Sequence, residues 1–369
     1  MTRALAALAL VGSLALAACG GGDDAGSATT ASGPATTPAT ALAGGERDTV
    51  TLLTYDSFPD SGTSLNDALA AFTDETGTAV ELVVGGDVGT MVSKAVLTAG
   101  NPEGDVIFGI DNSFLSRAVD GGVLEPYEAQ GLDRVPAELR ELVPGHEATP
   151  VDYGDVCVNY DIDWFGRRGL EPPADLAALT EPAYRDLLVV ENPATSSPGL
   201  AFVLASIAAF GEGWTDWWAD LRENGVAVVD NWTSAYYEEF SWAGGERPLV
   251  VSYGSSPPAE VIFADPPVDE APTAAIESTC FRQVEFAGIL AGTDAPEGAR
   301  RLVDFLVSER FQSELALNLF VYPANRDVAL PEEFTDNAIV AEDPYELDPD
   351  EIAAGREGWI ETWTDVVLR

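Results

Sequence analysis

The chain has 369 residues, 46% of them hydrophobic, and it carries 62 acidic against 18 basic residues, which gives a formal net charge of −44. This length and composition are sufficient for two domains or two lobes around a large core. The charge excludes nucleic acid as a partner, because a phosphate backbone would be repelled, whereas a cationic ligand would be attracted; a solvated acidic surface that favours solubility explains the same charge.

The N-terminal residues have the composition of an export signal. Arg3 supplies a positive charge, residues 4–16 form an apolar segment too short for a stable membrane span, and residues 16–19 (LAAC) resemble a bacterial lipobox. We predict a lipoprotein signal peptide over residues 1–19 with lipidation of Cys19. The mature protein is then exported and lipid-anchored to the outer face of the cell membrane, at the cell surface or in the periplasm. An ordinary signal peptide with an incidental cysteine is the alternative.

Residues 20–47 lack periodicity and large apolar side chains. Such a segment cannot bury enough apolar surface to offset the entropy of ordering. We therefore predict a flexible tether between the anchor and the folded body, with a root-mean-square reach of roughly 30 Å.

The folded body begins with alternating strand-like and helix-like segments. In order, the patterns predict a strand at 49–54, a helix capped by Ser64 and ended by Gly77, a strand at 79–85, a helix at 90–100 and a strand at 104–111. The first helix has an apolar face made by Leu65, Ala68, Leu69 and Phe72. This β-α-β-α-β order predicts a parallel, doubly wound sheet whose ligands bind at the carboxyl ends of the strands. Three polar segments follow those ends: Tyr55-Asp56-Ser57, Gly86-Asp87 and Asp111-Asn112.

The second part of the chain follows a different order of elements. Strands are predicted at 150–161, 187–191, 226–230, 248–253 and 281–290, and helices at 197–210, 214–221, 234–245, 297–316 and within 348–368. We read two α/β lobes joined by crossing strands, with the C-terminus packed on the first lobe. The first lobe comprises residues 48–150 with 285–369, and the second comprises residues 151–284.

Two cysteines remain in the predicted body, Cys157 and Cys280. Outside the cytoplasm, an even pair of cysteines usually forms a disulfide, and we predict one here. The alternative is that Cys157 is a catalytic nucleophile.

Seven loop segments resemble, in order along the chain, the thiamine-binding proteins of bacterial ABC transporters. They are TYDSF (54–58), GIDN (109–112), VDYG (151–154), NPATSSPGL (192–200), NWTSAY (231–236), VSYGSSP (251–257) and VYPAN (321–325). The resemblance implies a two-lobed type II periplasmic-binding-protein fold, in which each lobe is a mostly parallel sheet with flanking helices and the ligand cleft lies between the lobes. It also implies a monomeric receptor, not an enzyme, that needs no cofactor and no metal. Such a receptor closes on thiamine or its phosphate esters and delivers the ligand to a membrane permease driven by an ATPase on other chains.

Thiamine needs flat aromatic faces for its rings, an environment for one positive charge, and donors for its hydroxyethyl or phosphate tail. A cation over an aromatic ring is stabilised by about 0.5–2 kcal/mol, best with tryptophan. The resemblance implies ring stacking by Trp232 and ligand contacts by Tyr253 and Tyr55. Phe320 stands where relatives often carry tryptophan, and Tyr236 is a residue of the cleft wall or of helix packing.

The polar part of the site follows from the same matched segments. For the tail, the resemblance implies Ser196 and Ser197, which lead into an apolar helix whose N-terminus favours an anion. The loop of Gly254, Ser255 and Ser256 matches a second ligand-contacting loop. For the cation and the amino group the candidates are Asp87, Asp56, Asp111 and Asp152, each of which could instead cap a turn or a helix.

Three alternatives belong to other functional classes. Ferric receptors of the same architecture use a tyrosine pair, which Tyr236-Tyr237 could supply, although neighbours on a helix point about 100° apart. Polyamine receptors have similar acidic and aromatic cages. Thiaminase-I-like enzymes use a cysteine nucleophile that needs a base, and the only histidine is His146.

Overall fold

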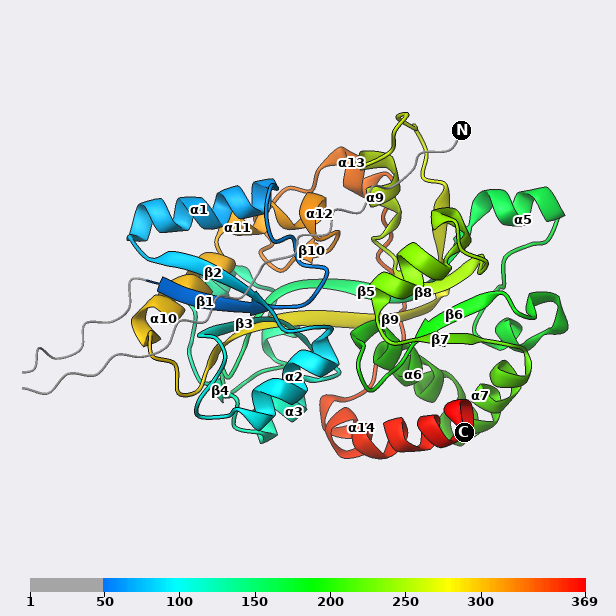
Figure 1. The fold of residues 1–369 in the computed structure, drawn as a ribbon, viewed down its shortest axis with the longest axis horizontal. Coiled ribbons are helices and arrows are strands. Elements are labelled where there is room, and N and C mark those ends of the chain that lie inside the picture. The colour runs from blue at the N-terminus through cyan, green and yellow to red at the C-terminus, as the bar shows by residue number, and fades with distance from the viewer. Residues whose placement is uncertain (1–48) are drawn as a thin grey trace, which may run out of the picture. The chain divides into compact units, whose positions relative to one another are not determined.

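One sheet runs through residues 49–369, the part of the chain that the computed structural model describes. The predicted signal peptide, Cys19 and the tether lie outside these residues. The strand order is β2-β1-β3-β9-β5-β8-β6-β7, with β4 paired to β9 and β10 to β5 (Figure 1). The strands are β1 (Thr49–Thr54), β2 (Ala79–Val84), β3 (Val106–Asp111), β4 (Leu124–Glu125), β5 (Thr149–Asp161), β6 (Leu188–Glu191), β7 (Ala227–Val229), β8 (Leu249–Tyr253), β9 (Thr273–Leu290) and β10 (Tyr322–Pro323).

Helices cover both faces of this sheet. Before β9 they are α1 (Ser64–Thr76), α2 (Val88–Leu97), α3 (Leu115–Asp120), α4 (Ala137–Arg140), α5 (Ile162–Arg168), α6 (Ser197–Phe210), α7 (Trp214–Glu223), α8 (Trp232–Ser234) and α9 (Pro257–Ile262). After β9 they are α10 (Pro296–Leu306), α11 (Glu309–Gln312), α12 (Leu315–Asn318), α13 (Glu332–Thr335) and α14 (Pro349–Trp363). Among the described residues, no helix combines the length and the apolar composition that a membrane span requires.

The first half of the sheet, β2, β1 and β3, has the predicted parallel order. β1 pairs in parallel with β2 on one side and with β3 on the other. Successive side chains of β1 pack on opposite faces of the sheet. Leu52 belongs to the hydrophobic cluster that includes α1 and α10, and Leu53 belongs to the cluster that includes α2. This alternation is the two-residue period of a strand buried on both faces. Figure 1 shows α1 on one side of these strands and α2 and α3 on the other.

Helix α1 keeps its predicted apolar face but not its predicted cap. Thr63, not Ser64, is the N-cap, and it forms a reciprocal capping box with Asn66. The prediction was off by one residue because either hydroxyl could have served. Gly77 ends the helix as predicted, in a left-handed conformation with φ of 73°.

The two longest strands, β5 and β9, run antiparallel through the middle of the sheet. β5 pairs with β9 along most of its length. β9 also pairs with β3, in the first half of the sheet, and β5 also pairs with β8, in the second half. The sequence predicted β9 only from residue 281, because residues 273–279 are partly exposed and do not alternate. The prediction of crossing strands is thus confirmed, but the crossing is longer than expected.

The second half of the sheet consists of β8, β6 and β7, and helix α6 packs on one face of it (Figure 1). β6 pairs in parallel with both β7 and β8, as a βαβ order requires. Eleven consecutive residues of α6, from Ser197 to Ile207, are buried. Such a helix is apolar all round because it is covered on all sides.

Two predicted helices are shorter than their patterns suggested. The segment 234–245 contains only the last residue of the turn α8, a π-helical turn over Ala235–Glu239 and a further short turn over Ser241–Ala243. The segment 297–316 divides into α10, α11 and α12, because Ser308 leaves the helical conformation and caps α11.

The end of the chain also departs from the prediction that it packs on the first lobe. Helix α14 does contact α3, through the Arg117–Glu357 ion pair of 3.1 Å. Beyond it, Trp363 meets Trp218 of α7 edge-on at 5.5 Å. The last turn therefore packs on the half that was predicted as the second lobe, and the lobe boundaries stay predictions.

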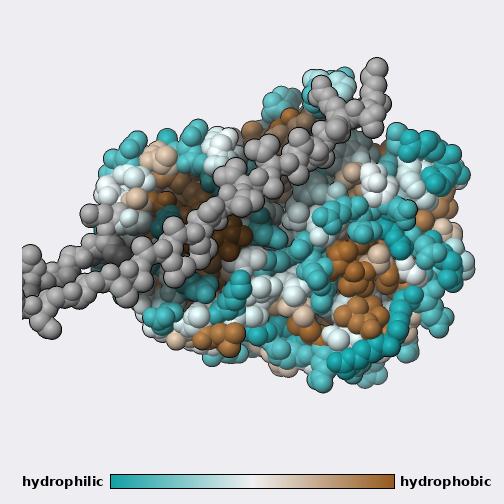
Figure 2. Space-filling view, in the orientation of Figure 1, coloured by the Kyte–Doolittle hydropathy of each residue, from teal (hydrophilic) through white to brown (hydrophobic). Residues whose placement is uncertain are grey.

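Figure 2 shows that hydrophilic residues cover most of the visible face, with hydrophobic patches between them.

Candidate ligand-binding site

A cavity of about 320 Å³ lies where the two halves of the sheet face each other. Small-molecule sites in proteins are typically concave and of this size or larger. Nine of the fourteen predicted ligand-binding residues line it: Tyr55, Asp56, Asp87, Ser197, Trp232, Tyr236, Tyr253, Ser256 and Phe320. Lining residues that the sequence did not single out for the ligand include Val88, Pro198, Tyr237, Phe263, Glu285 and Asn318.

One wall of the cavity is aromatic, and Trp232 is its centre. The Trp232 ring stacks on Tyr236, with ring centroids 5.1 Å apart and an interplanar angle of 22°. Tyr237 and Tyr253 meet the indole edge-on, at 5.6 and 6.5 Å. The indole Nε1 donates a hydrogen bond of 2.9 Å to Ser252 Oγ. Packing and this bond fix the ring before any ligand arrives.

The local sequence explains why Trp232 faces the cavity. Asn231 accepts a hydrogen bond of 2.8 Å from the amide of Ser234 and so caps a single helical turn. The π-helical turn that follows places Tyr236 beneath the indole, where its hydroxyl donates 2.7 Å to Glu260. Tyr236 is 1% exposed, so it supports the wall from behind.

Tyr55 forms the opposite side of the cavity. Its ring lies directly on Gly109, where an added Cβ would come within 2.3 Å of the ring. Gly109 also has φ of +97°, a backbone conformation that favours glycine. Both the close approach of the Tyr55 ring and this backbone conformation therefore require glycine at position 109. Phe58 and Phe108 meet the Tyr55 ring at 6.1 and 6.2 Å.

Two phenylalanines from different halves meet at the rim. Phe320 adopts φ of +56°, and its ring lies edge-on to Phe263 with centroids 5.7 Å apart. Phe263 is 70% exposed. The pair places apolar surface at the edge of the cavity.

Ser197 and Asp111 form a polar contact between the halves. Ser197, the first residue of α6, lines the cavity, and its hydroxyl donates to the Asp111 carboxylate. Asp111 also accepts from the amide and the hydroxyl of Ser113. Asp111 is thus buried behind the cavity wall instead of lining it. Burial raises the pKa of its carboxyl group.

Asp87 bridges the halves at another point. It caps α2, accepting 2.7 Å from the amide of Val88, and its second oxygen accepts 3.4 Å from the amide of Trp232. Burial raises the pKa of Asp87 to about 6.

A third contact between the halves involves backbone only. The amide of Gly89 donates 2.9 Å to the carbonyl oxygen of Thr195. An added Cβ on Gly89 would lie 2.8 Å from that oxygen. A glycine at this position allows α2 to approach the loop before α6.

The other four predicted residues that do not line the cavity have structural surroundings. Ser196 and Ser255 are buried. The Ser255 hydroxyl has no hydrogen-bond partner within the described part of the chain, whereas the Ser196 side chain interacts with Asp87. Gly254 faces Ile339, which an added Cβ would approach within 2.9 Å. Asp152 is buried in the sheet beneath the cavity. The sequence could not separate Ser196, Gly254 and Ser255 from the lining positions, because they share motifs with residues that line the cavity. The motif of Asp152, residues 151–154, contributes no lining residue.

Among the lining residues that the sequence did not single out, Glu285 is the charged one. It lies on β9, opposite Asp111 of β3 on one side and Asp152 of β5 on the other. It is 5% exposed. A charged residue inside the otherwise apolar VEFAGIL strand was the available signal. Its meaning depends on strand register, which the sequence did not give.

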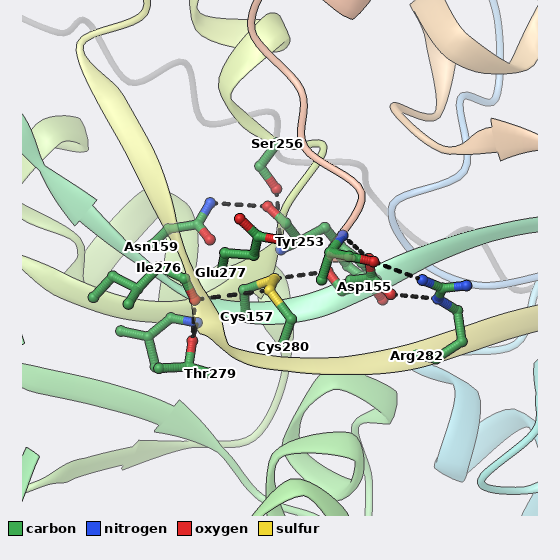
Figure 3. Close-up of a disulfide and its surroundings, with 12 residues drawn as sticks. Asp155, Cys157, Asn159, Tyr253, Ser256, Ile276, Glu277, Thr279, Cys280 and Arg282 are labelled. Atoms are coloured by element: carbon green, nitrogen blue, oxygen red, sulfur yellow. Dashed lines mark hydrogen bonds and ion pairs between the residues drawn. A yellow bond between two sulfur atoms is a disulfide. The ribbon is translucent and has the colours of Figure 1, made fainter. Parts of the chain in front are cut away.

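The predicted disulfide joins Cys157 of β5 to Cys280 of β9 (Figure 3). Next to it, Arg282 pairs with Asp155 at 2.5 Å, and Asp155 also accepts 2.7 Å from the amide of Ala341. Neither cysteine lines the cavity. A disulfide-bonded cysteine has no thiolate, which removes Cys157 as a nucleophile in this state.

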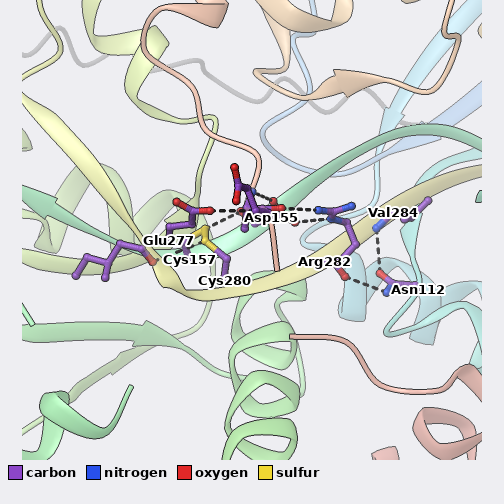
Figure 4. A network of polar contacts seen from close by, with 10 residues as sticks. Asn112, Asp155, Cys157, Glu277, Cys280, Arg282 and Val284 are labelled. Atoms are coloured by element: carbon purple, nitrogen blue, oxygen red, sulfur yellow. Dashed lines mark hydrogen bonds and ion pairs between the residues drawn. A yellow bond between two sulfur atoms is a disulfide. The ribbon is translucent and has the colours of Figure 1, made fainter. Parts of the chain in front are cut away.

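The same network reaches the first half of the sheet through Asn112. Its side-chain amide donates 3.2 Å to the carbonyl oxygen of Arg282, and its oxygen accepts 3.1 Å from the amide of Val284 (Figure 4). Asn112 follows β3 directly, so these bonds fix the end of β3 to β9.

The tyrosine pair is not arranged as two free phenolates. Tyr236 is buried and donates to Glu260, and its pKa is raised by burial and by the Glu260 charge. Tyr237 is 53% exposed, with its ring edge-on to Tyr236. Among residues 49–369, no three histidine, cysteine or acidic side chains are grouped as metal ligands.

Comparison with known proteins gives consistent matches. A family model described as bacterial extracellular solute-binding protein matches residues 101–341. Proteins named thiamine-binding periplasmic protein from Salmonella typhimurium and Escherichia coli are each 28% identical, and each match covers 87% of this chain and 94% of theirs. A solved structure described as a periplasmic thiamin binding protein superposes with a TM-score of 0.76 at 27% identity, covering 87% of this chain and 96% of that one.

Proposed function

The chain belongs to the bacterial extracellular solute-binding protein family, and from this premise we propose that it is a receptor for thiamine. The relatives named for thiamine binding support the choice of ligand, since the matches span nearly their whole length. The receptor captures thiamine outside the cytoplasm and delivers it to an ABC permease. It works by binding and closure, without chemistry on the ligand.

One observation carries the proposal: the cavity combines a fixed aromatic wall with buried carboxyl groups. Trp232 supplies a flat face, while Asp87 and Glu285 supply negative charge or hydrogen-bond acceptors. No lysine, arginine or histidine lines the cavity among the residues described. This lining suits a flat organic cation, which gains from both the ring face and the carboxylates.

The tail of the ligand is assigned to the N-terminus of α6. Ser197 lines the cavity there, at the start of a helix of 14 residues whose amides favour a polar or anionic group. The acidic surroundings disfavour a doubly charged phosphate, so we rank thiamine above its phosphate esters.

Closure is assigned to the contacts between the halves. The Gly89–Thr195, Asp87–Trp232 and Ser197–Asp111 hydrogen bonds form only when the two sides of the cavity are close. A ligand that touches both sides favours the state in which these bonds exist, and the permease distinguishes that state from the open one.

Anchoring by a lipid at Cys19 and a monomeric state complete the proposal. A tethered receptor stays near its permease while its body turns freely. Labelling with a radioactive fatty acid tests the anchor: the wild-type protein should take up the label and the Cys19→Ser variant should not, and an unlabelled wild-type protein would contradict lipid anchoring.

Isothermal titration calorimetry tests the ligand. The purified protein is titrated with thiamine, thiamine monophosphate, thiamine diphosphate, spermidine and iron(III). We expect saturable binding of thiamine at a ratio of one. Tight binding of iron(III) or spermidine without binding of any thiamine form would refute the proposal.

A further inference from the structure

Three carboxyl groups lie in one row across the centre of the sheet, directly beneath the cavity. Asp111 of β3, Glu285 of β9 and Asp152 of β5 are in register on adjacent strands. Residues opposite each other on neighbouring strands have Cβ atoms about 4.5–5.5 Å apart. All three side chains are buried, with exposed fractions of 5% or less.

The row has free hydrogen-bonding capacity. Asp111 is satisfied by Ser113 and Ser197, but neither carboxylate oxygen of Asp152 has a partner. Glu285 Oε1 accepts a hydrogen bond of 3.0 Å from the side-chain Nε2 of Gln283, whereas Glu285 Oε2 has no partner. Glu285 is the member of the row that lines the cavity.

No cation balances these groups within the described part of the chain. None of the ion pairs there includes Asp87, Asp111, Asp152 or Glu285. The titratable groups that face Glu285 are Asp152, Asp111, Asp87, Tyr55 and Tyr253, and every one of them is an acid. Buried like charges cannot all be ionised, so without a cation the row is at least partly protonated.

The direction of the acidities agrees with this geometry. Burial raises the pKa of Asp152 to about 8. Burial, followed by the charges of Asp152 and Asp111, raises the pKa of Glu285 well above its ordinary value.

We propose that Glu285 holds the positive charge of the ligand, and that binding of the cation displaces a proton from the Glu285–Asp152 pair. This inference rests on the proposed function, since it assumes a cationic ligand in the cavity. The carboxyl O–H bond breaks, its electron pair stays on the oxygen, and the proton passes to solvent as the cation arrives. An opposite charge within about 4–6 Å favours the ionised carboxylate, which supplies the coupling.

Two consequences distinguish this arrangement from a carboxylate that is already ionised before the ligand binds. Affinity for the cation should rise with pH, because protons and cation compete for one site and linkage is reciprocal. A neutral ligand of the same shape should bind without releasing protons. The neutral probe is the thiophene analogue of thiamine, in which carbon replaces the quaternary nitrogen.

The first measurement uses the wild-type protein alone. Calorimetry in buffers of different ionisation enthalpy counts the protons released, and we expect up to one for thiamine and none for the thiophene analogue. Thiamine binding without proton release would overturn this inference and leave the proposed function standing. Failure to bind any thiamine form would overturn both.

The second measurement uses Glu285→Gln, which keeps the size of a protonated glutamic acid. We expect at least about a tenfold loss of thiamine affinity, since a charge partner is removed. The pH dependence should flatten, while binding of the thiophene analogue changes little. Glu75→Gln, on the exposed face of α1, removes the same charge from the surface and should behave as wild type. Equal thiamine affinity of the Glu285→Gln protein and wild type would overturn the inference; if Glu285→Gln does not fold, the wild-type proton count still decides.

Discussion

The indole of Trp232 is held by the Tyr236 ring beneath it, the edges of two further tyrosines and a hydrogen bond to Ser252. A side chain fixed in this way loses little additional entropy when a ligand stacks on it. The flat face of the indole therefore binds a ligand with little loss of side-chain entropy. This property comes from the packing around Trp232 as much as from the tryptophan itself.

Replacing Trp232 with alanine should weaken thiamine binding by on the order of 1–3 kcal/mol, by analogy with bases stacked on aromatic side chains. Calorimetry measures the change. Trp164→Ala, on α5 and outside the cavity lining, is the matched control and should retain wild-type affinity. Unchanged affinity of the Trp232→Ala protein would remove this residue from the site.

The sequence predicted only some of the residues that line the cavity. Trp232, Tyr253 and Ser197 stand in segments whose local pattern identifies a loop at a strand or helix end, and they line the cavity. Glu285 lies in the middle of a strand, so the local sequence pattern predicted a residue of the sheet and not a residue of the ligand-binding site. Its position beside Asp152 follows from pairing between strands 133 residues apart, which no local rule supplies.

Among the elements, the approach of α2 to the loop before α6 depends on one glycine. Gly89→Ala should place a methyl group against the Thr195 carbonyl oxygen and keep the halves apart. We expect thiamine affinity to fall on the order of tenfold, because the competent state is less populated. Small-angle scattering should also show less compaction on ligand addition.

The control for this variant is Gly166→Ala in α5, where an added Cβ meets nothing within 4 Å and φ is not positive. It should match wild type in affinity and in compaction. A Gly89→Ala protein that behaves identically to it would show that the Gly89–Thr195 contact does not contribute to closure.

The disulfide fixes the two central strands to each other. Cys157 and Cys280 are 123 residues apart in sequence, and a bond closing so long a loop restricts the unfolded chain strongly. Replacing both cysteines with serine should lower the free energy of unfolding by roughly 2–5 kcal/mol. Denaturant unfolding measures this difference, with reduced wild type as a parallel sample.

A thiol assay on the native protein checks the same bond directly. We expect no free thiol at Cys157 or Cys280 before reduction and two after it. Two reactive thiols in the native, unreduced protein would contradict the disulfide and reopen the nucleophile hypothesis.

The elements that were predicted well are those with strong local periodicity. β1, α1, β2, α2 and β3 follow the expected order, because each has an alternating or helical apolar pattern bounded by turn residues. The failures have specific causes. The 297–316 helix broke at Ser308, which prefers to cap, and the first part of β9 carries no alternation because it is partly exposed.

For the whole molecule, the row of buried carboxyl groups contributes to the response of stability to pH, together with Asp87, Glu191 and Glu260, whose pKa values burial also raises. Asp152 has a folded-state pKa of about 8, above the value of about 4 expected in the unfolded chain. Between these values Asp152 binds more protons in the folded chain than in the unfolded one, so the stability that it contributes falls as pH rises.

We therefore expect the free energy of unfolding of the ligand-free protein to decrease from about pH 4 to about pH 8. Asp152→Asn should reduce that slope, since the amide does not titrate. Urea unfolding at several pH values measures both proteins. An identical slope for the two would show that Asp152 does not contribute.

The disulfide also has a mechanical consequence for a protein pulled from its ends. Cys157 and Cys280 enclose β6, β7, β8 and the helices between them, so tension passes from β5 to β9 through the sulfur atoms and bypasses that segment. In a force–extension experiment, roughly 400 Å of contour length would stay hidden until the bond is reduced, at about 3.3–3.6 Å per residue. Under load, one side of the cavity could unravel while the half that carries Trp232 keeps its fold.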